Sequence, residues 1–178
     1  MTPQDTTTTP AELGLPTGTW RLDPAASRLE FTVKTMWGLA TVNGHFDKYD
    51  GTLDVRPDGV DATLTIDPST LDTGHAKRDE HLRTADFFGV DEHAEITFVA
   101  TAITPRDGGL TITGDLRVRA TTVRLHLPVD VQHGENGRLH LTTATDVTRD
   151  KVGLTWNKLG MIRGDAHLRA DLELVPDR

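Results

Sequence analysis

From Thr19 onward, the chain alternates between apolar and polar residues with a period of two. In RLEFTVK (28–34), Leu29, Phe31 and Val33 share one face, and charged residues and a threonine occupy the other. Alternation of this kind is typical of antiparallel strands that bury one face and expose the other. The same pattern recurs at 41–47, 61–67, 95–102, 109–120, 123–131, 138–147 and 167–175.

Turn signals separate these segments, at 57–59 (PDG), 105–109 (PRDGG) and 134–137 (GENG). The chain contains no internal repeat and no linker between domains. Roughly eight strands at this spacing predict an all-β domain, either a barrel or a sandwich. A closed sheet of about eight strands is wide enough to fill itself with side chains or to hold one small ligand.

Small residues stand among the leucines, valines and phenylalanines of the predicted inward faces. They are Ala62, Ala100, Ala102, Gly114, Ala120 and Ala170. Small inward residues can leave room for an apolar cavity, or they can face bulky partners across a filled core. Periodicity indicates faces and not volumes, so both interpretations stay open.

One segment, LDTGHAKRDEHLRTADFF (71–88), breaks the alternation with a concentration of charged residues. No proline or glycine interrupts residues 75–88, and Leu82 can pack against a sheet. The segment therefore predicts a short helix in a long connection, with Asp72 or Thr73 as its N-cap.

The sequence gives little support for a metal site or a catalytic site. His75, Asp79 and His81 are possible ligands, but on a helix His81 is six residues from His75 and points away from it. The strand histidines occupy outward positions; they are His45, His126, His140 and His167. The chain has no cysteine, no G-x-S-x-G elbow and no phosphate-binding glycine loop. We therefore expect no metal, no cofactor and no catalytic residue.

The 178 residues suggest one domain, and a net charge of −8 argues against nucleic acid and anionic membrane surfaces as partners. No apolar run has the roughly 18 residues of a membrane span. The opening residues lack the basic and apolar regions of a secretory signal. We expect a flexible N-terminal tail (1–18), a single domain (19–178) and a cytoplasmic location.

Five segments carry a resemblance to a known family. They are WRLDPAASRLEFTVK (20–34), VNGHFDKYDGTLDV (42–55), the charged segment with its Leu71–Gly74, Arg78–Leu82 and Asp86–Phe88 motifs followed by Ile96–Phe98, ITGDLRVRATTVRLHLPVDV (112–131) and Thr148–Leu154. In this order and at these intervals they resemble the YceI-like family of polyisoprenoid-binding proteins. The resemblance covers about Trp20 to Leu174.

The resemblance implies a lipocalin-like, extended antiparallel β-barrel with a long apolar tunnel and one short helix. Relatives bind long-chain isoprenoids, such as quinones or polyprenyl compounds, or other long-chain lipids. We therefore expect noncatalytic binding, storage or transport of an isoprenoid or another amphiphilic lipid. The tunnel wall is expected to include Phe31, Val33, Phe46, Leu64, Ile66, Phe98, Leu116, Leu125 and Leu127.

Three further residues are candidates by position. Trp37 lies near a tunnel mouth or packs as a rim aromatic on its loop. Arg78 and His81 contact a polar headgroup, or they pair with neighbouring carboxylates and hold the helix.

Two other functions remain open. A lipid-modifying or hydrolytic enzyme could use residues of segment 75–81 as acid–base groups inside the barrel. Alternatively, an interaction module could form a homodimer through the threonine-rich outer face or an edge strand.

Overall fold

The computed structural model describes residues 9–154, 157 and 160–177. Within these residues it contains eleven strands, one α-helix and five short 3-10 helices. The strands are β1 (Gly18–Leu22), β2 (Arg28–Thr35), β3 (Ala40–Phe46), β4 (Tyr49–Arg56), β5 (Gly59–Ile66), β6 (Leu71–Asp72), β7 (Ile96–Arg106), β8 (Gly109–Val118), β9 (Thr121–His133), β10 (Leu139–Val147) and β11 (Arg163–Pro176). The helices are α1 (Ala76–Arg83), η1 (Pro24–Ala26), η2 (Met36–Gly38), η3 (Pro68–Thr70), η4 (Glu135–Gly137) and η5 (Arg149–Val152).

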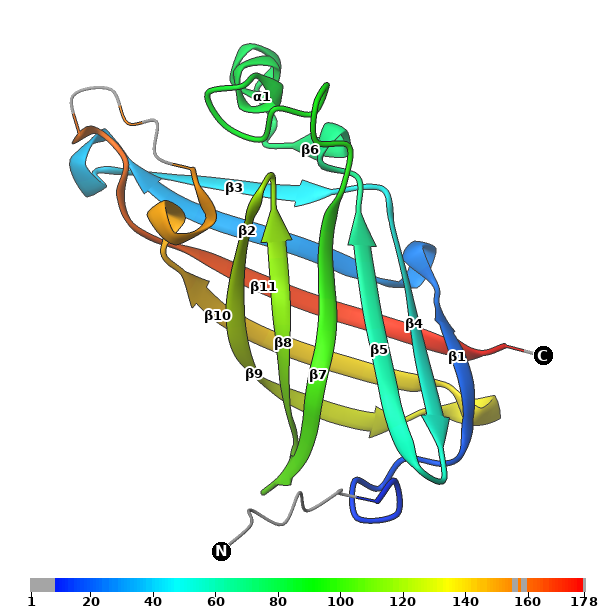
Figure 1. Cartoon of the computed structure of the whole chain (residues 1–178). Helices are drawn as coiled ribbons and strands as arrows, with labels where there is room; N and C mark the ends of the chain where they lie inside the picture. The colour runs from blue at the N-terminus through cyan, green and yellow to red at the C-terminus, as the bar shows by residue number, and fades with distance from the viewer. Residues whose placement is uncertain (1–8, 155–156, 158–159, 178) are drawn as a thin grey trace, which may run out of the picture.

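Eight of the described strands close into an antiparallel barrel (Figure 1). Their order around the barrel is β1–β4–β5–β7–β8–β9–β10–β11, and β11 pairs with β1 to complete the ring. At this seam Trp20 lies opposite Pro176 and Leu22 opposite Leu174. The prediction of an antiparallel barrel of about eight strands is confirmed.

The first part of the chain extends the barrel along β11. One edge of β11 pairs with β10, and the other edge is shared by β1 and β2, which η1 separates. Leu22 of β1 lies opposite Leu174 of β11, whereas Phe31 of β2 lies opposite Leu168 of β11. On their other edges, β1 pairs with β4, and β2 pairs with β3. The result is an elongated barrel with β11 running along its length.

The long connection between β6 and β7 covers one end of the barrel. Strand β6 pairs with β3, where Phe46 faces Leu71, and α1 stands beyond it in Figure 1. The helix is confirmed, but it ends at Arg83, and its N-cap is His75, whose Nδ1 accepts a hydrogen bond from the Arg78 N–H at 3.3 Å.

The predicted caps Asp72 and Thr73 are wrong, because both side chains are used elsewhere. Asp72 accepts a hydrogen bond from the Gly74 N–H at 2.7 Å. The Thr73 hydroxyl donates to the carboxylate of Asp79.

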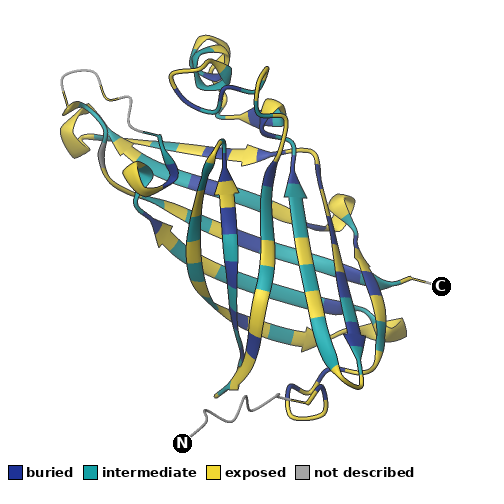
Figure 2. Ribbon diagram, viewed as in Figure 1, coloured by how far each residue is buried: buried dark blue, intermediate teal, exposed yellow. Residues whose placement is uncertain are grey.

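Buried and exposed residues alternate along the strands, as Figure 2 shows, but two predicted inward positions are wrong. Ala102 is exposed and Ile103 is buried, because the register of β7 against β8 shifts between Ala100 and Ala102. Such a bulge reverses the faces of the residues that follow it. Ala120 is also exposed, because β8 ends at Val118 and a turn follows.

At two glycines on the inner face, an aromatic ring occupies the space that a side chain would take. A Cβ on Gly114 would lie 2.8 Å from Cε2 of Phe98, and a Cβ on Gly44 would lie 2.8 Å from Cε1 of Phe31. At Gly114, therefore, the filled-core interpretation is correct.

The predicted N-terminal tail is described only from residue 9. Leu13 and Leu15 are 8% and 5% exposed and belong to the hydrophobic core. The structure thus differs from a flexible tail at these two leucines, because their burial removes apolar surface from water. Residues 1–8 lie outside the described residues, and the division of the chain at residue 18 stays a prediction.

Candidate functional site

A cavity of about 470 Å³ lies inside the barrel. Five alternate residues of β11 line it, namely Ala166, Leu168, Ala170, Leu172 and Leu174. At roughly 3.3 Å per residue, the span from Ala166 to Leu174 is about 26 Å. The cavity is therefore a tunnel along the barrel, and its volume falls within the roughly 300–1,000 Å³ typical of small-ligand sites.

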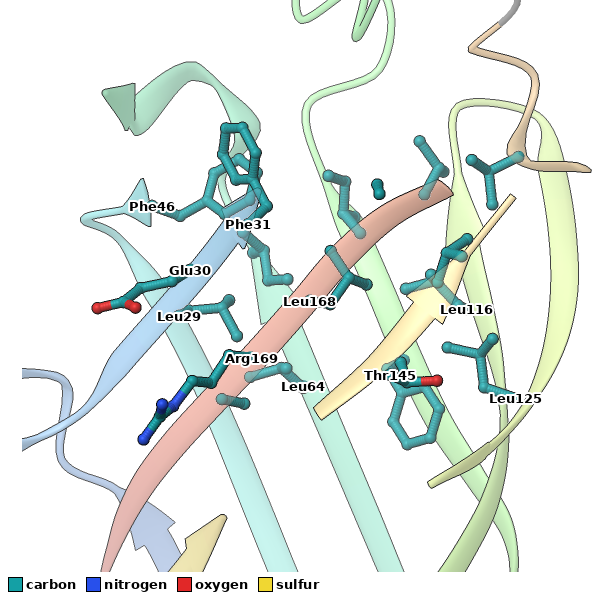
Figure 3. A pocket seen from close by; sticks show the side chains of 18 of the residues that line it. Leu29, Glu30, Phe31, Phe46, Leu64, Leu116, Leu125, Thr145, Leu168 and Arg169 are labelled. Carbon is teal, nitrogen blue, oxygen red and sulfur yellow. The ribbon is translucent and has the colours of Figure 1, made fainter. Parts of the chain in front are cut away.

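The lining of this tunnel is almost entirely apolar. In Figure 3, Leu64, Leu116, Leu125 and Leu168 converge on the open space from different strands. Leu64 and Leu125 are partly exposed although they face inward, because the tunnel leaves space in front of them. The same reasoning separates Ala62, which lines the tunnel and is partly exposed, from the ring-covered Gly114.

The structure brings together eleven of the twelve residues that the sequence predicted for the site. The eleven are Phe31, Val33, Phe46, Leu64, Ile66, Arg78, His81, Phe98, Leu116, Leu125 and Leu127. Trp37 is not among the lining residues; it is 51% exposed, and its backbone N–H donates to Met161 at 2.9 Å. Contact of any of these residues with a ligand stays a prediction.

Three phenylalanines join the helical connection to the barrel wall. The ring centroids of Phe31 and Phe46 are 5.3 Å apart, and those of Phe46 and Phe88 are 6.0 Å apart in an edge-to-face arrangement. Figure 3 shows Phe31 and Phe46 side by side at the tunnel. Because Phe88 follows α1, this cluster fixes the connection over the apolar space.

Arg78 and His81 line the tunnel but also have partners in the connection. Arg78 donates from Nε to the Thr73 hydroxyl at 2.7 Å and from Nη2 to the Thr73 carbonyl at 2.8 Å. His81 Nε2 lies 2.9 Å from Asp86 Oδ2. The expected carboxylate pairing thus occurs for His81, whereas Arg78 contacts a threonine instead.

Asp79 is the buried polar residue at the centre of this connection. It is 6% exposed, and its carboxylate accepts from the Thr73 N–H at 3.0 Å and from the Thr73 hydroxyl. Together with the capping role of His75, these bonds tie the predicted acid–base groups to the local fold.

A model of the YceI-like domain matches residues 20–174. The chain belongs to the YceI-like family. It is 32% identical over 145 residues to a UPF0312 protein of Staphylococcus aureus (strain MRSA252), and the aligned region covers 76% of this chain and 82% of the relative.

Two solved structures share the fold of this YceI-like chain. BcnA of Burkholderia cenocepacia matches with a TM-score of 0.77 and 20% identity over 85% of this chain and 98% of that one. A polyisoprenoid binding domain from Saccharophagus degradans, implicated in plant cell wall breakdown, matches with a TM-score of 0.74 and 16% identity over 89% and 98%.

The YceI-like tunnel also contains residues that the sequence analysis missed. The predicted wall left out Leu29, which shares the inward face of Phe31 and Val33, and also Ile112 and Leu141, which follow the same alternation. Arg149 and Ile162 also line the tunnel. They lie outside the alternating segments, so periodicity carried no signal for them.

Ionisable groups of the YceI-like barrel with shifted pKa values lie away from the tunnel. Burial raises the pKa of Tyr49, and Asp47 adds to the effect. Hydrogen bonds from Arg56 and then Thr19 lower the pKa of Asp54. Neither Tyr49 nor Asp54 is a lining residue.

Three exposed side chains on the outside of the YceI-like barrel could approach a cation together. Ligand atoms of His45, Asp47 and Asp72 lie within 4.8 Å of one another. His45 Nε2 is already 3.1 Å from Asp47 Oδ1, and Asp72 accepts from Gly74. Because these side chains are exposed and already have local partners, we do not assign a metal site to them.

In the described ranges, no helix of this YceI-like chain combines the length and the apolar character that a membrane span requires.

Proposed function

We propose that the protein binds a long-chain isoprenoid lipid, of the polyprenyl or isoprenoid quinone type, in its barrel tunnel and stores or carries it unchanged. The apolar lining that follows β11 from Ala166 to Leu174 is the observation that carries this proposal. Each methylene that leaves water contributes about 0.8 kcal/mol, so a long hydrocarbon chain can bind through burial alone.

The comparisons support the class of ligand. The chain belongs to the YceI-like family and shares the fold of a domain described as polyisoprenoid binding. An apolar cavity inside an elongated barrel suits a long hydrocarbon chain better than a compact polar substrate.

Support for a role without catalysis comes from the segment that could have held acid–base groups. His75 caps α1, Asp79 accepts hydrogen bonds from Thr73, and His81 pairs with Asp86. Neither His75 nor Asp79 is a lining residue of the tunnel, so both are poor candidates for moving protons to and from a substrate bound there.

Blocking the tunnel with apolar bulk tests the proposal. Ala62→Trp places a large side chain on the lining, and we expect it to abolish uptake of geranylgeraniol measured by native mass spectrometry. The variant is expected to fold, because the added ring occupies space that is open in the wild-type barrel. Ala102→Trp is the matched control, since Ala102 is exposed on the outer face.

We expect wild-type protein and Ala102→Trp to bind the lipid alike. Uptake that survives in folded Ala62→Trp would place the lipid outside the tunnel. Failure of the wild-type protein to bind any prenyl lipid would refute the proposal without reference to either variant.

A further inference from the structure

The loop that joins β2 to β3, residues 36–39, exposes a cluster of large apolar side chains. Four such side chains are exposed in the described part of the chain, and three of them, Met36, Trp37 and Leu39, belong to this loop. Met36 and Trp37 are about half exposed, and Leu39 is 86% exposed. The fourth, Val99, lies on β7, which does not pair with β2 or β3. Single exposed apolar residues are ordinary, but several gathered on one loop indicate a contact surface.

The backbone of this loop is also unusual for its residue types. Met36 and Trp37 have φ angles of 51° and 55°, in the left-handed region. Glycine, asparagine and aspartate are the residues that hairpin turns favour at such positions, because a larger side chain is strained there. The loop therefore keeps two bulky apolar residues where small or polar ones would be less strained, and it leaves much of both side chains in water. A strained loop of this kind is often functional.

The apolar loop adjoins one end of the tunnel. Thr35, directly before it, and Val42, shortly after it, both line the tunnel. The backbone N–H of Trp37 donates to the carbonyl oxygen of Met161 at 2.9 Å, and Met161 is itself a lining residue. In Figure 1 the loop, in light blue, projects from the same end of the barrel as η5. The exposed apolar surface is thus continuous with the lining of the tunnel.

The sequence around the loop and around Met161 contains no carboxylate. Residues 31–46 and 151–164 have no aspartate or glutamate, although the chain has 27 acidic residues among its 178. Lys34 and Lys151, one in each segment, are exposed. Apolar side chains flanked by lysines, without acidic neighbours in the sequence, match a surface that is apolar inside and carries phosphates outside.

A lipid bilayer fits this surface better than a second protein does. A stable protein interface buries roughly 800 Å² on each partner, which is more than three side chains of one projecting loop offer. A bilayer needs no matching surface, and tryptophan is enriched where the headgroups meet the hydrocarbon.

We propose that residues 36–39 insert their apolar side chains into the surface of a lipid bilayer, with Lys34 and Lys151 beside the headgroup phosphates. The docked protein turns one end of its tunnel toward the membrane, so that a lipid passes between them without crossing water. Docking goes beyond the proposed function, because it concerns the outer surface, whereas the passage of lipid rests on that function.

The overall charge of −8 does not oppose this contact. It argues against a broad approach to an anionic membrane, but docking through one loop is local. At physiological ionic strength the Debye length is about 8 Å, so carboxylates farther from the membrane are screened.

Cosedimentation with phosphatidylcholine vesicles tests the docking. The wild-type protein is expected to bind the vesicles, and Leu39→Asp is expected to lower the partition coefficient about tenfold or more, since a charge replaces a buried leucine. Val99→Asp is the matched control, because Val99 is an apolar residue with 48% exposure outside the loop, and its binding should equal that of the wild-type protein. Both variants are expected to unfold at the wild-type midpoint, because both side chains are exposed.

A fluorescent label locates the contact. The chain has no cysteine, so Leu39→Cys and Val99→Cys each give a single site for an environment-sensitive dye. The dye at residue 39 should brighten and shift to the blue when vesicles are added, whereas the dye at residue 99 should not change. An equal response at both residues would show that the protein adheres without using the loop.

Two further measurements separate docking from tunnel binding. Ala62→Trp, with its tunnel blocked, should bind vesicles as the wild-type protein does. Leu39→Asp should take up geranylgeraniol from solution with wild-type affinity but should extract it from vesicles about tenfold more slowly. An unchanged rate of extraction overturns the role of the loop in lipid passage.

The remaining outcomes are distinct. A wild-type protein that ignores vesicles overturns docking and leaves isoprenoid binding intact, whereas one that binds vesicles but no geranylgeraniol overturns the proposed function alone. A mass that rises with protein concentration, and that Leu39→Asp keeps at one chain, assigns the loop to a second copy of the protein instead.

Discussion

The ring of Phe31 lies directly over Gly44 on the neighbouring strand. The two residues are paired across β2 and β3, and a Cβ on Gly44 would approach Cε1 and Cε2 of the ring to 2.8 Å. Phe31 also contacts Phe46, which in turn packs against Phe88 of the helical connection. The glycine therefore sets the position of a ring that both lines the tunnel and anchors the segment over its end.

Gly44→Ala is expected to destabilise the protein by about 1–3 kcal/mol, because the added methyl forces the Phe31 ring out of its position. Phe31 lines the tunnel, so we expect its displaced ring to occupy tunnel space and prenyl lipid binding to weaken together with stability. Urea unfolding followed by fluorescence measures the first effect, and lipid titration measures the second.

Gly59→Ala is the control for this substitution. A Cβ at Gly59 would meet no atom closer than Arg56 Nη2 at 3.9 Å. Its stability should therefore stay close to that of the wild-type protein. Equal effects of the two substitutions would show that the contact with Phe31 is not the cause.

Asp79→Asn is expected to destabilise the connection between β6 and β7 by about 1.5–3 kcal/mol, because the buried carboxylate loses charge-assisted hydrogen bonds from Thr73. Hydrogen exchange of the α1 amides should accelerate with it. Glu80→Gln, at the exposed neighbouring position, should leave both unchanged. If the two variants unfold at the same denaturant concentration, the buried carboxylate does not hold the connection.

We expect the lowered pKa of Asp54 to make the stability of the protein depend on pH. Its pKa lies below the ordinary value of 3.8, because Arg56 and then Thr19 donate hydrogen bonds to the carboxylate. A group with a lowered pKa in the folded state stabilises the protein above its unfolded-state pKa, and this contribution is lost as the pH falls through the folded-state pKa. Arg56→Gln should therefore raise the pKa of Asp54, as read from the carboxyl carbon in an NMR titration.

Arg21→Gln is the control, since Arg21 lies on the adjacent strand β1 without a contact to this carboxylate. It should leave the titration of Asp54 in place. An unchanged Asp54 pKa in Arg56→Gln would contradict the assignment of the shift to the guanidinium.

Alternation along the chain predicted the barrel because an antiparallel strand with one face in solvent buries every second residue, and those residues are apolar. It placed His126 outside and Leu125 inside, as the structure does. It misplaced Ala102 because a bulge in β7 shifts the phase without changing the residue types around it. The only local sign was Ile103, a large apolar residue in the supposedly outward phase.

The volume of the tunnel could not be predicted in the same way. Ala62 and Gly114 are both small inward residues, yet one faces open space and the other lies under the ring of Phe98. The difference depends on which residues lie on the neighbouring strands, as Phe98 of β7 does beside Gly114 of β8, and a single strand does not reveal them. Arg149 escaped the analysis because it lies in a 3-10 turn, where no periodicity distinguishes a solvated arginine from a buried one. Cytoplasmic location and homodimer formation stay predictions.

The most direct test of the central claim is to extract the purified protein with organic solvent and identify what is released by mass spectrometry, with native mass spectrometry of the intact protein alongside. The account predicts a long-chain isoprenoid at close to one molecule per chain, which an extract of the Ala62→Trp variant should lack. Wild-type protein that releases no lipid, and that also takes up no prenyl lipid when offered it, would contradict the account.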